Sequence, residues 1–168
     1  MGFRVILLAL MGLIPILALN AQIKTVDHVD LDKYLGKWYE IGRYPTKFQK
    51  DCYSSTATYS LDKKGNIIVL NECRKGSPDG KNKFVKGKAH IVDKKTNAKL
   101  KVTFFWPFYG DYWIIDLEKD YKYAVVSEPS MKYLWILSRT PKLDPDTEKG
   151  IYERLSKWGY DTKKIIKM

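Results

Sequence analysis

Short runs of apolar or alternating residues, separated by turn residues at intervals of about 8–15 positions, occupy the chain from Gly36 to Thr140. This spacing is typical of an all-β sandwich or barrel. We expect eight strands, over residues 38–44, 53–61, 66–74, 84–92, 98–105, 111–117, 121–127 and 133–139. Because the connections are short, successive strands should pair with one another. The sequence therefore predicts an all-β domain built on an eight-stranded antiparallel up-and-down β-barrel.

Two short aromatic blocks bracket these strands, GKWYEI at residues 36–41 and LWILSRTP at residues 134–141. The first block supplies Trp38 and the second supplies Arg139. In a closed barrel the indole can fill the floor while the guanidinium stacks across it, a contact worth roughly 0.5–2 kcal/mol. The other end of the barrel then stays open. The resulting cup suggests a carrier.

One helix is expected after the last strand of the barrel. Asp144 suits its N-cap, Pro145 its first position, and Gly159 the position just after its end. Three apolar residues recur at i, i+4 and i+7 and would form the face that covers the sheet: Ile151, Leu155 and Trp158. A short final strand is expected at 164–167, and residues 31–35 are expected to form one turn that caps the floor.

The first 21 residues have the pattern of a secretory signal peptide. Arg4 provides the positive start, residues 5–17 are apolar, and the segment ends at Ala21. Pro15 and Asn20 interrupt a run that is already shorter than the roughly 20 residues of a membrane anchor. No cysteine stands at the exit of this segment, so the pattern does not indicate a lipoprotein. We expect a signal peptide over 1–21 and one domain over 22–168 of an exported protein.

The chain of 168 residues carries a formal net charge of +11. Its lysines are scattered over hairpin ends and alternate strand positions, where they keep strands from pairing edge to edge. We favour this interpretation over attraction to acidic glycans or lipid headgroups, and a peripheral contact with an anionic membrane surface stays open. Export argues against nucleic acid as a partner.

Cys52 and Cys73 are the two cysteines of the chain, and they suit an oxidising compartment. They flank two strand-like runs, so a hairpin would bring both sulfur atoms to the same end of the strand pair. Strict alternation places the two residues on opposite faces, and we therefore expect Cys52 in the loop just before its strand. A disulfide would close a loop of about 20 residues and contribute roughly 3 kcal/mol. Two free thiols or a metal pair are less well supported.

The sequence contains no recognisable catalytic constellation. Its two histidines, His28 and His90, have no Ser, Cys or carboxylate partner at a recognisable spacing. Phosphate loops, zinc-ligand clusters and nucleophile elbows are absent from the sequence. Glu40 and Asp116 lie within expected strands and would orient a ligand if they point inward. We expect no enzyme activity, no cofactor and no metal.

Aromatic residues are concentrated in the second half of the chain, from Phe104 to Trp135. Ordinary core packing explains many of them. In an eight-stranded barrel, however, alternation points half of each strand into a space that is either filled by side chains or left for one small ligand. Tyrosines suit a hollow that holds an apolar chain and hydrogen-bonds its polar head.

Five sequence blocks, in order and at family spacing, resemble the lipocalins and span nearly the whole domain. They are YLGKWYEI at 34–41, ATYSL at 57–61, KGKA at 86–89, FYGDY at 108–112 and YLWILSRTP at 133–141. The similarity is greatest to the branch of bacterial lipocalins and apolipoprotein D. The usual Thr-Asp-Tyr motif is represented by Lys119-Asp120-Tyr121, which indicates a turn of different shape. The Cys52–Cys73 pair resembles the bridge of some branch members.

The resemblance implies a calyx that binds one small hydrophobic molecule, with a structural plug made of Gly36, Trp38 and Arg139. In the family register Leu137 also faces inward. The implied cavity wall consists of Tyr59, Val69, Asn71, Val85, Val102, Phe104, Tyr112, Ile114, Val126, Tyr133 and Trp135. Such walls suit a fatty acid or a lysophospholipid. Its acyl chain would lie among Val102, Phe104 and Trp135, with the headgroup near the open rim and its lysines.

The expected function is therefore binding and transport or storage of such a lipid at the cell envelope, in the periplasm or after secretion. Two alternatives stay open. One is an enzyme acting on a lipophilic substrate in the same cavity. The other is a barrel that binds a macromolecular partner through its outer face or loops. The oligomeric state, monomer or dimer, is not indicated.

Overall fold

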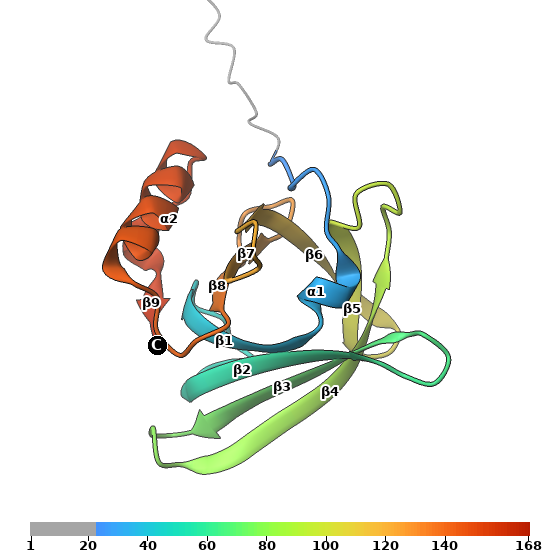
Figure 1. The fold of residues 1–168 in the computed structure, drawn as a ribbon. Helices are drawn as coiled ribbons and strands as arrows, with labels where there is room; N and C mark the ends of the chain where they lie inside the picture. Colours follow the sequence, from blue (N-terminus) through green and yellow to red (C-terminus); the bar gives the residue numbers. More distant parts are fainter. Residues whose placement is uncertain (1–22) are drawn as a thin grey trace, which may run out of the picture.

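A computed structural model of the chain describes residues 23–168, in which eight antiparallel strands close into a barrel (Figure 1). The expected signal peptide lies outside the described residues. The strands are β1 (Gly36–Arg43), β2 (Cys52–Leu61), β3 (Ile67–Lys75), β4 (Lys81–Ile91), β5 (Lys99–Phe105), β6 (Phe108–Leu117), β7 (Tyr123–Ser127) and β8 (Leu134–Ser138). Each strand pairs with its successor, and β1 pairs with both β2 and β8. The predicted up-and-down barrel is confirmed.

Several strand boundaries differ from expectation by one to three residues. β4 and β6 each begin three residues earlier than predicted, at Lys81 and Phe108. The longer β6 includes Gly110, which pairs with Val102 within the β5–β6 ladder. β7 begins later than predicted because Tyr121 adopts a φ of 61° in the preceding turn, which an extended strand does not accommodate.

An irregularity in β2 explains the position of the first cysteine. The pairing register of β2 with β3 shifts between Tyr53 and Thr56, where Ser54 adopts a φ of 47°. A bulge of this kind adds a residue to one strand and so cancels the alternation between its two sides. The prediction of Cys52 in a loop is therefore wrong, because Cys52 is the first residue of β2. The predicted disulfide with Cys73 is confirmed, with the Cα atoms 5.4 Å apart.

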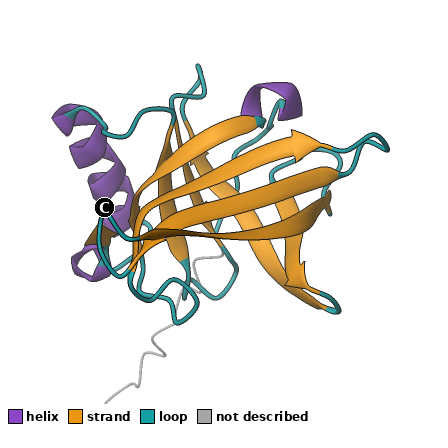
Figure 2. Ribbon diagram, turned by 90° about the horizontal axis from the view of Figure 1, so that it is seen from below, coloured by secondary structure: helices purple, strands orange, loops and turns teal. Residues whose placement is uncertain are grey.

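Two helices take different places around the barrel. α1 (Leu31–Tyr34) lies within the outline of the strand ring, whereas α2 (Pro145–Lys157) packs on the outside of the wall (Figures 1 and 2). The side chain of Asp144 accepts a hydrogen bond from the Thr147 amide at 2.9 Å, which confirms the predicted N-cap. None of the helices in residues 23–168 is long and apolar enough to span a membrane.

The apolar face of α2 is shorter than predicted. Ile151 and Leu155 are buried against outward-facing residues of β7 and β8, as expected. Trp158 is 40 % exposed, because it is the C-cap residue at which the chain leaves the helix. Gly159 follows with a φ of 87°, the expected conformation after a helix end.

The chain ends in a short 3₁₀ turn, η1 (Thr162–Lys164), and a strand, β9 (Ile166–Lys167), that is shorter than predicted. β9 pairs with Gly42 and Arg43 of β1. This edge of β1 is free there because its pairing with β2 ends at Tyr39.

The up-and-down order places the connections alternately at the two ends of the barrel. We call one end the closed end. It contains α1 and the turns 62–66, 92–98 and 118–122. The Val29 amide bonds to the Thr96 carbonyl at 2.7 Å, and the Asp30 amide donates to the Tyr121 hydroxyl at 2.7 Å, so the leading segment is tied to two of these turns. The open end contains the connections 44–51, 76–80, 106–107 and 128–133.

Candidate functional site

Trp38 and Arg139 meet at the closed end. The Trp38 indole is fully buried, and the Arg139 guanidinium carbon lies 3.7 Å from the centre of its ring. The Trp38 Nε1 donates to the carbonyl of Tyr34 at 2.8 Å. Arg139 donates to the carbonyls of Lys37 at 3.0 Å and Lys33 at 2.5 Å. These bonds satisfy carbonyl groups near the end of α1 and fix the guanidinium flat on the indole.

Gly36 makes room for this stack. Its φ is 94°, a conformation that residues with a Cβ rarely adopt. A Cβ at this position would also lie 3.4 Å from the Nη1 of Arg139. The structure thus brings together the three residues expected at the floor.

Three tyrosines from α1, β2 and β6 stand directly above the floor. The Tyr112 hydroxyl lies 2.7 Å from those of both Tyr34 and Tyr59. Burial raises the pKa of Tyr59 to about 12 and the pKa values of Tyr34 and Tyr112 well above the usual value for phenols. Three neutral hydroxyls joined by two hydrogen bonds leave one O–H hydrogen free to donate to another group.

The interior around these tyrosines is nearly filled. A cavity of about 10 Å³ remains there, close to the smallest that holds one water molecule. It is lined by Leu31, Tyr34, Leu35, Tyr59, Ile67, Ala89, Leu100, Val102, Tyr112 and Ile114. The barrel around and below the tyrosines therefore has no room for a ligand.

Inward-facing residues become less buried from the closed end to the open end. On β8, Leu137 is 4 % exposed, Trp135 is partly exposed, and Tyr133 just before the strand is 40 % exposed. On β5, Leu100 is buried whereas Phe104 is partly exposed. The same gradient on different strands means that the interior is accessible from the open end.

The expected wall residues fall into three groups. Eight belong to the inner core cluster or pack against it: Tyr59, Val69, Val102, Phe104, Tyr112, Ile114, Val126 and Trp135. Asn71 and Val85 are opposite each other in the β3–β4 ladder and are partly buried. Tyr133 lies at the rim of the open end, where its ring stacks on Trp135 with centroids 5.9 Å apart.

Two residues near the wall were not predicted. Phe48, in the β1–β2 connection, packs its ring 6.0 Å from that of Tyr133 and 6.4 Å from that of Trp135. Gly87 lies under the Phe104 ring, and a Cβ on it would come within 2.7 Å of that ring. The alternation of apolar residues could not identify either position, since Phe48 lies in a loop and Gly87 is a glycine within a strand.

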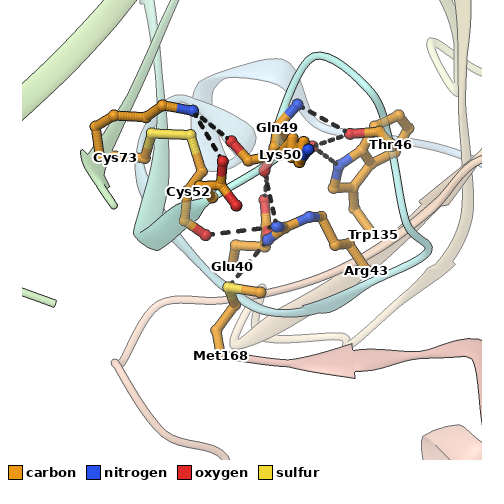
Figure 3. Close-up of a disulfide and its surroundings, with 11 residues drawn as sticks. Glu40, Arg43, Thr46, Gln49, Lys50, Cys52, Cys73, Trp135 and Met168 are labelled. Atoms are coloured by element: carbon orange, nitrogen blue, oxygen red, sulfur yellow. Dashed lines mark hydrogen bonds and ion pairs between the residues drawn. A yellow bond between two sulfur atoms is a disulfide. The ribbon is translucent and has the colours of Figure 1, made fainter. Parts of the chain in front are cut away.

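A polar network lies beside the Cys52–Cys73 disulfide, in the open-end half of the barrel (Figure 3). The buried pair Glu40 and Arg43 is joined at 2.5 Å. Gln49 donates to Glu40 at 2.7 Å, accepts from the Trp135 Nε1 at 2.9 Å, and offers its backbone carbonyl to Arg43 at 3.0 Å. Gln49 thereby ties the β1–β2 connection to the barrel wall. Burial raises the pKa of Glu40, although Arg43 and Gln49 act in the opposite direction.

A bulge in β1 creates this network. Glu40 is opposite Leu137 and Arg43 is opposite Trp135, with a register shift between Glu40 and Gly42. Directly opposed residues share a face of the sheet, so Glu40 and Arg43 both point inward. The sequence indicated Glu40 as an inward carboxylate. It gave no signal for Arg43, because simple alternation would place one of the two outside.

Asp116 does not point inward, so the condition under which it would orient a ligand is not met. Its Oδ2 accepts from Arg154 of α2 at 2.8 Å and 2.9 Å, on the outer face of the barrel. The register of β6 shifts between Ile114 and Asp116, which turns the carboxylate outward. Within residues 23–168, His, Cys, Asp and Glu side chains form no group of three or more that could hold a metal ion.

A second hollow, of about 480 Å³, lies where β1 and β2 separate. Most of its lining is polar or charged and includes Lys37, Glu72, Arg74 and Asn82. An acyl chain would gain little burial in such surroundings, so the interior of the barrel is the better candidate site.

Comparison with known proteins agrees with this geometry. A family model described as a lipocalin-like domain matches residues 29–168. Outer membrane lipoprotein Blc of Escherichia coli strain K12 is 40 % identical over 146 residues, which cover 86 % of this chain and 81 % of that protein. Apolipoprotein D of Mus musculus is 39 % identical over 150 residues, which cover 83 % of this chain and 76 % of that protein.

The fold is also shared with a solved structure. Insecticyanin of the tobacco hornworm Manduca sexta superposes with a TM-score of 0.70 at 22 % identity, covering 86 % of this chain and 82 % of the other. The predicted resemblance to bacterial lipocalins and apolipoprotein D is thus confirmed. The chain belongs to the lipocalin family, whose members bind small hydrophobic ligands.

Proposed function

We propose that the protein binds one fatty acid or lysophospholipid inside the barrel and transports or stores it without a covalent step. The observation that carries this proposal is the gradient of burial along the inward-facing residues. Packing is nearly complete at the tyrosines and loosens toward the open end. The inward-facing residues of β5 and β8 there are apolar and aromatic, and they lie opposite the buried pair Glu40 and Arg43 of β1.

In the proposed pose the acyl chain lies among Val102, Phe104 and Trp135, and the headgroup lies toward the open end. Each buried methylene contributes about 0.8 kcal/mol before the losses of entropy on binding. A chain of ordinary length would then bind with micromolar or tighter affinity. The free O–H of the tyrosine group offers a hydrogen bond to any polar atom that reaches the bottom of the accessible space.

We propose no enzymatic activity for this cavity. A cysteine nucleophile is not available in the same space, because both cysteines of the chain are joined to each other. Glu40, the inward carboxylate, is already paired with Arg43 and Gln49. These contacts leave the carboxylate a structural role in holding the β1–β2 connection.

We further propose that the chain is exported, with residues 1–21 as its signal peptide, and acts in the periplasm or after secretion. The related Blc protein is named an outer membrane lipoprotein. No cysteine stands directly at the expected cleavage site, and we propose a peripheral relation to a membrane. A contact with an anionic membrane surface is part of this proposal.

Titration with a fluorescent fatty acid tests the proposed cavity. Trp135→Ala and Tyr112→Ala should each weaken binding by about tenfold, because each removes a large part of the wall. Trp158→Ala is the matched control, since this tryptophan is partly exposed on the outside of the barrel. The variant should bind the fatty acid as tightly as the wild type does. All variants should keep the circular dichroism spectrum of the wild type, which shows that they are folded. Wild-type affinity in both wall variants would rule out the barrel interior as the binding site.

A further inference from the structure

The tip of the β5–β6 hairpin carries an exposed aromatic cluster. Phe105, Trp106 and Phe108 are 74 %, 82 % and 77 % exposed, and these are the three most exposed large apolar side chains of residues 23–168. Phe105 is directly opposite Phe108 in the ladder, so the two rings project to the same side of the hairpin. Isolated apolar residues on a surface are ordinary, but three within four positions form a patch.

This aromatic tip belongs to the open end of the barrel. It directly follows Phe104, which packs against the inner core cluster. Phe48 and Tyr133 lie in two other connections of the same end and are also exposed. The opening of the barrel therefore has aromatic side chains on more than one of its surrounding connections.

The open end also carries an excess of positive charge. Over residues 45–51, 74–83, 105–108 and 128–133 there are seven cationic side chains and three carboxylates. The cations are Lys47, Lys50, Arg74, Lys75, Lys81, Lys83 and Lys132. The segments of the closed end, 24–35, 61–66, 92–98, 118–122 and 139–144, are nearly balanced, with ten cations and eight carboxylates.

We propose that the open end docks on an anionic lipid bilayer, with Phe105, Trp106 and Phe108 inserted among the headgroups. Aromatic rings favour the interfacial layer of a membrane, and the surrounding lysines and arginine complement its negative charge. The inference rests on the proposed lipid-carrier function and specifies where the carrier meets its lipid source. Docking in this orientation places the opening of the barrel against the bilayer, so a lipid passes between the two without crossing bulk water.

Co-sedimentation with vesicles tests the proposal. The wild-type chain should bind vesicles of phosphatidylcholine containing about 30 % phosphatidylglycerol, and binding should fall at least about fivefold on pure phosphatidylcholine. The triple variant Phe105→Ser, Trp106→Ser, Phe108→Ser should lose at least about tenfold in partition coefficient. The emission of Trp106 should shift to shorter wavelength on wild-type docking, measured against Trp106→Ser.

A double variant at the other end of the barrel controls for general loss of surface apolarity. Leu61→Ser, Val92→Ser removes exposed apolar side chains from the closed end, and its partition should stay within about twofold of wild type. Equal binding by the wild type and the hairpin variant would overturn the proposal. So would absence of wild-type binding to the anionic vesicles, or an equal loss in the control. If the hairpin variant instead abolishes self-association in vesicle-free buffer and keeps vesicle binding, the tip is a contact between copies of the chain and the proposal is wrong.

Wild-type binding of the fluorescent fatty acid in vesicle-free buffer separates this inference from the proposed function. Fatty acid binding without vesicle docking overturns only the docking surface. Vesicle docking without fatty acid binding overturns the carrier function and the purpose assigned to docking.

Discussion

The two ends of the barrel use the same residue type in opposite ways. At the closed end Trp38 is fully buried, bonded to the Tyr34 carbonyl and covered by Arg139. At the open end Trp106 is 82 % exposed on a hairpin tip. The closed end is filled down to a cavity of one water molecule, whereas packing of the inward-facing residues loosens toward the open end. Stabilising contacts are thus concentrated at the closed end, whereas the open end leaves surface for a ligand.

The largest effect is expected when the tryptophan of each end is replaced by alanine and the two variants are compared. Trp38→Ala should lower the free energy of unfolding by about 3–5 kcal/mol, because it removes a fully buried ring and leaves a cavity beneath α1. Trp106→Ala should change it by less than about 0.5 kcal/mol, since an exposed ring makes few native contacts. Denaturant unfolding of both variants measures the difference. Similar losses in the two would mean that the ends do not differ in this way.

Removing the disulfide should produce the next largest effect. Cys52 and Cys73 are 21 residues apart and link the start of β2, next to the open-end connection 44–51, to β3. The double variant Cys52→Ser, Cys73→Ser should lose about 3 kcal/mol through the greater freedom of the unfolded chain. Thermal and denaturant unfolding should be compared with the wild type in both oxidised and reduced states. If reduction of the wild type costs nothing, the bridge does not support this part of the barrel.

A smaller effect is expected when Arg139, which stacks on Trp38 at the closed end, is replaced. Arg139→Ala should lower the melting temperature by an amount equivalent to about 1–2 kcal/mol, because it removes the stack on Trp38 and two hydrogen bonds to backbone carbonyls. Arg139→Lys should recover only part of the loss, since an ammonium group cannot lie flat on the indole while donating to both carbonyls. An unchanged melting temperature for the alanine variant would contradict the assigned role.

The smallest effect is confined to alkaline pH. An unfolded tyrosine ionises near pH 10, whereas Tyr59 in the folded chain has a pKa of about 12. The folded state therefore holds its proton longer, and stability should decline as the pH rises from about 10 towards 12. The stability of Tyr59→Phe should decline less over the same range, as measured by denaturant unfolding at each pH. Identical profiles would show that this tyrosine is accessible to solvent in the native state.

The fold was largely predictable from the sequence because its main signals are local. Alternation, turn residues and the capping pattern at Asp144 each act within a few positions, and they gave the barrel and α2. The bulges were not predictable, since an extra residue in a strand leaves no mark on a short alternating pattern. They account for the position of Cys52, the inward Arg43 and the outward Asp116.

The candidate site was predictable in part for the same reason. Residues on regular stretches of strand, such as Val69 and Ile114, lie where the expected register puts them. Contacts between distant segments were missed. Gln49 bonds to Trp135 across 86 positions, and the tyrosine group joins α1 to β2 and β6. Such contacts depend on how the barrel closes, which no local pattern records.

The central claim is that the barrel holds one hydrocarbon chain above its tyrosines. Native mass spectrometry of the purified chain with excess oleic acid tests this most directly. We predict a complex of one fatty acid with one chain for the wild type, strongly reduced in Trp135→Ala and retained in Trp158→Ala. A wild-type chain that stays unliganded at saturating oleic acid, or a Trp135→Ala variant that binds as the wild type does, would contradict the claim.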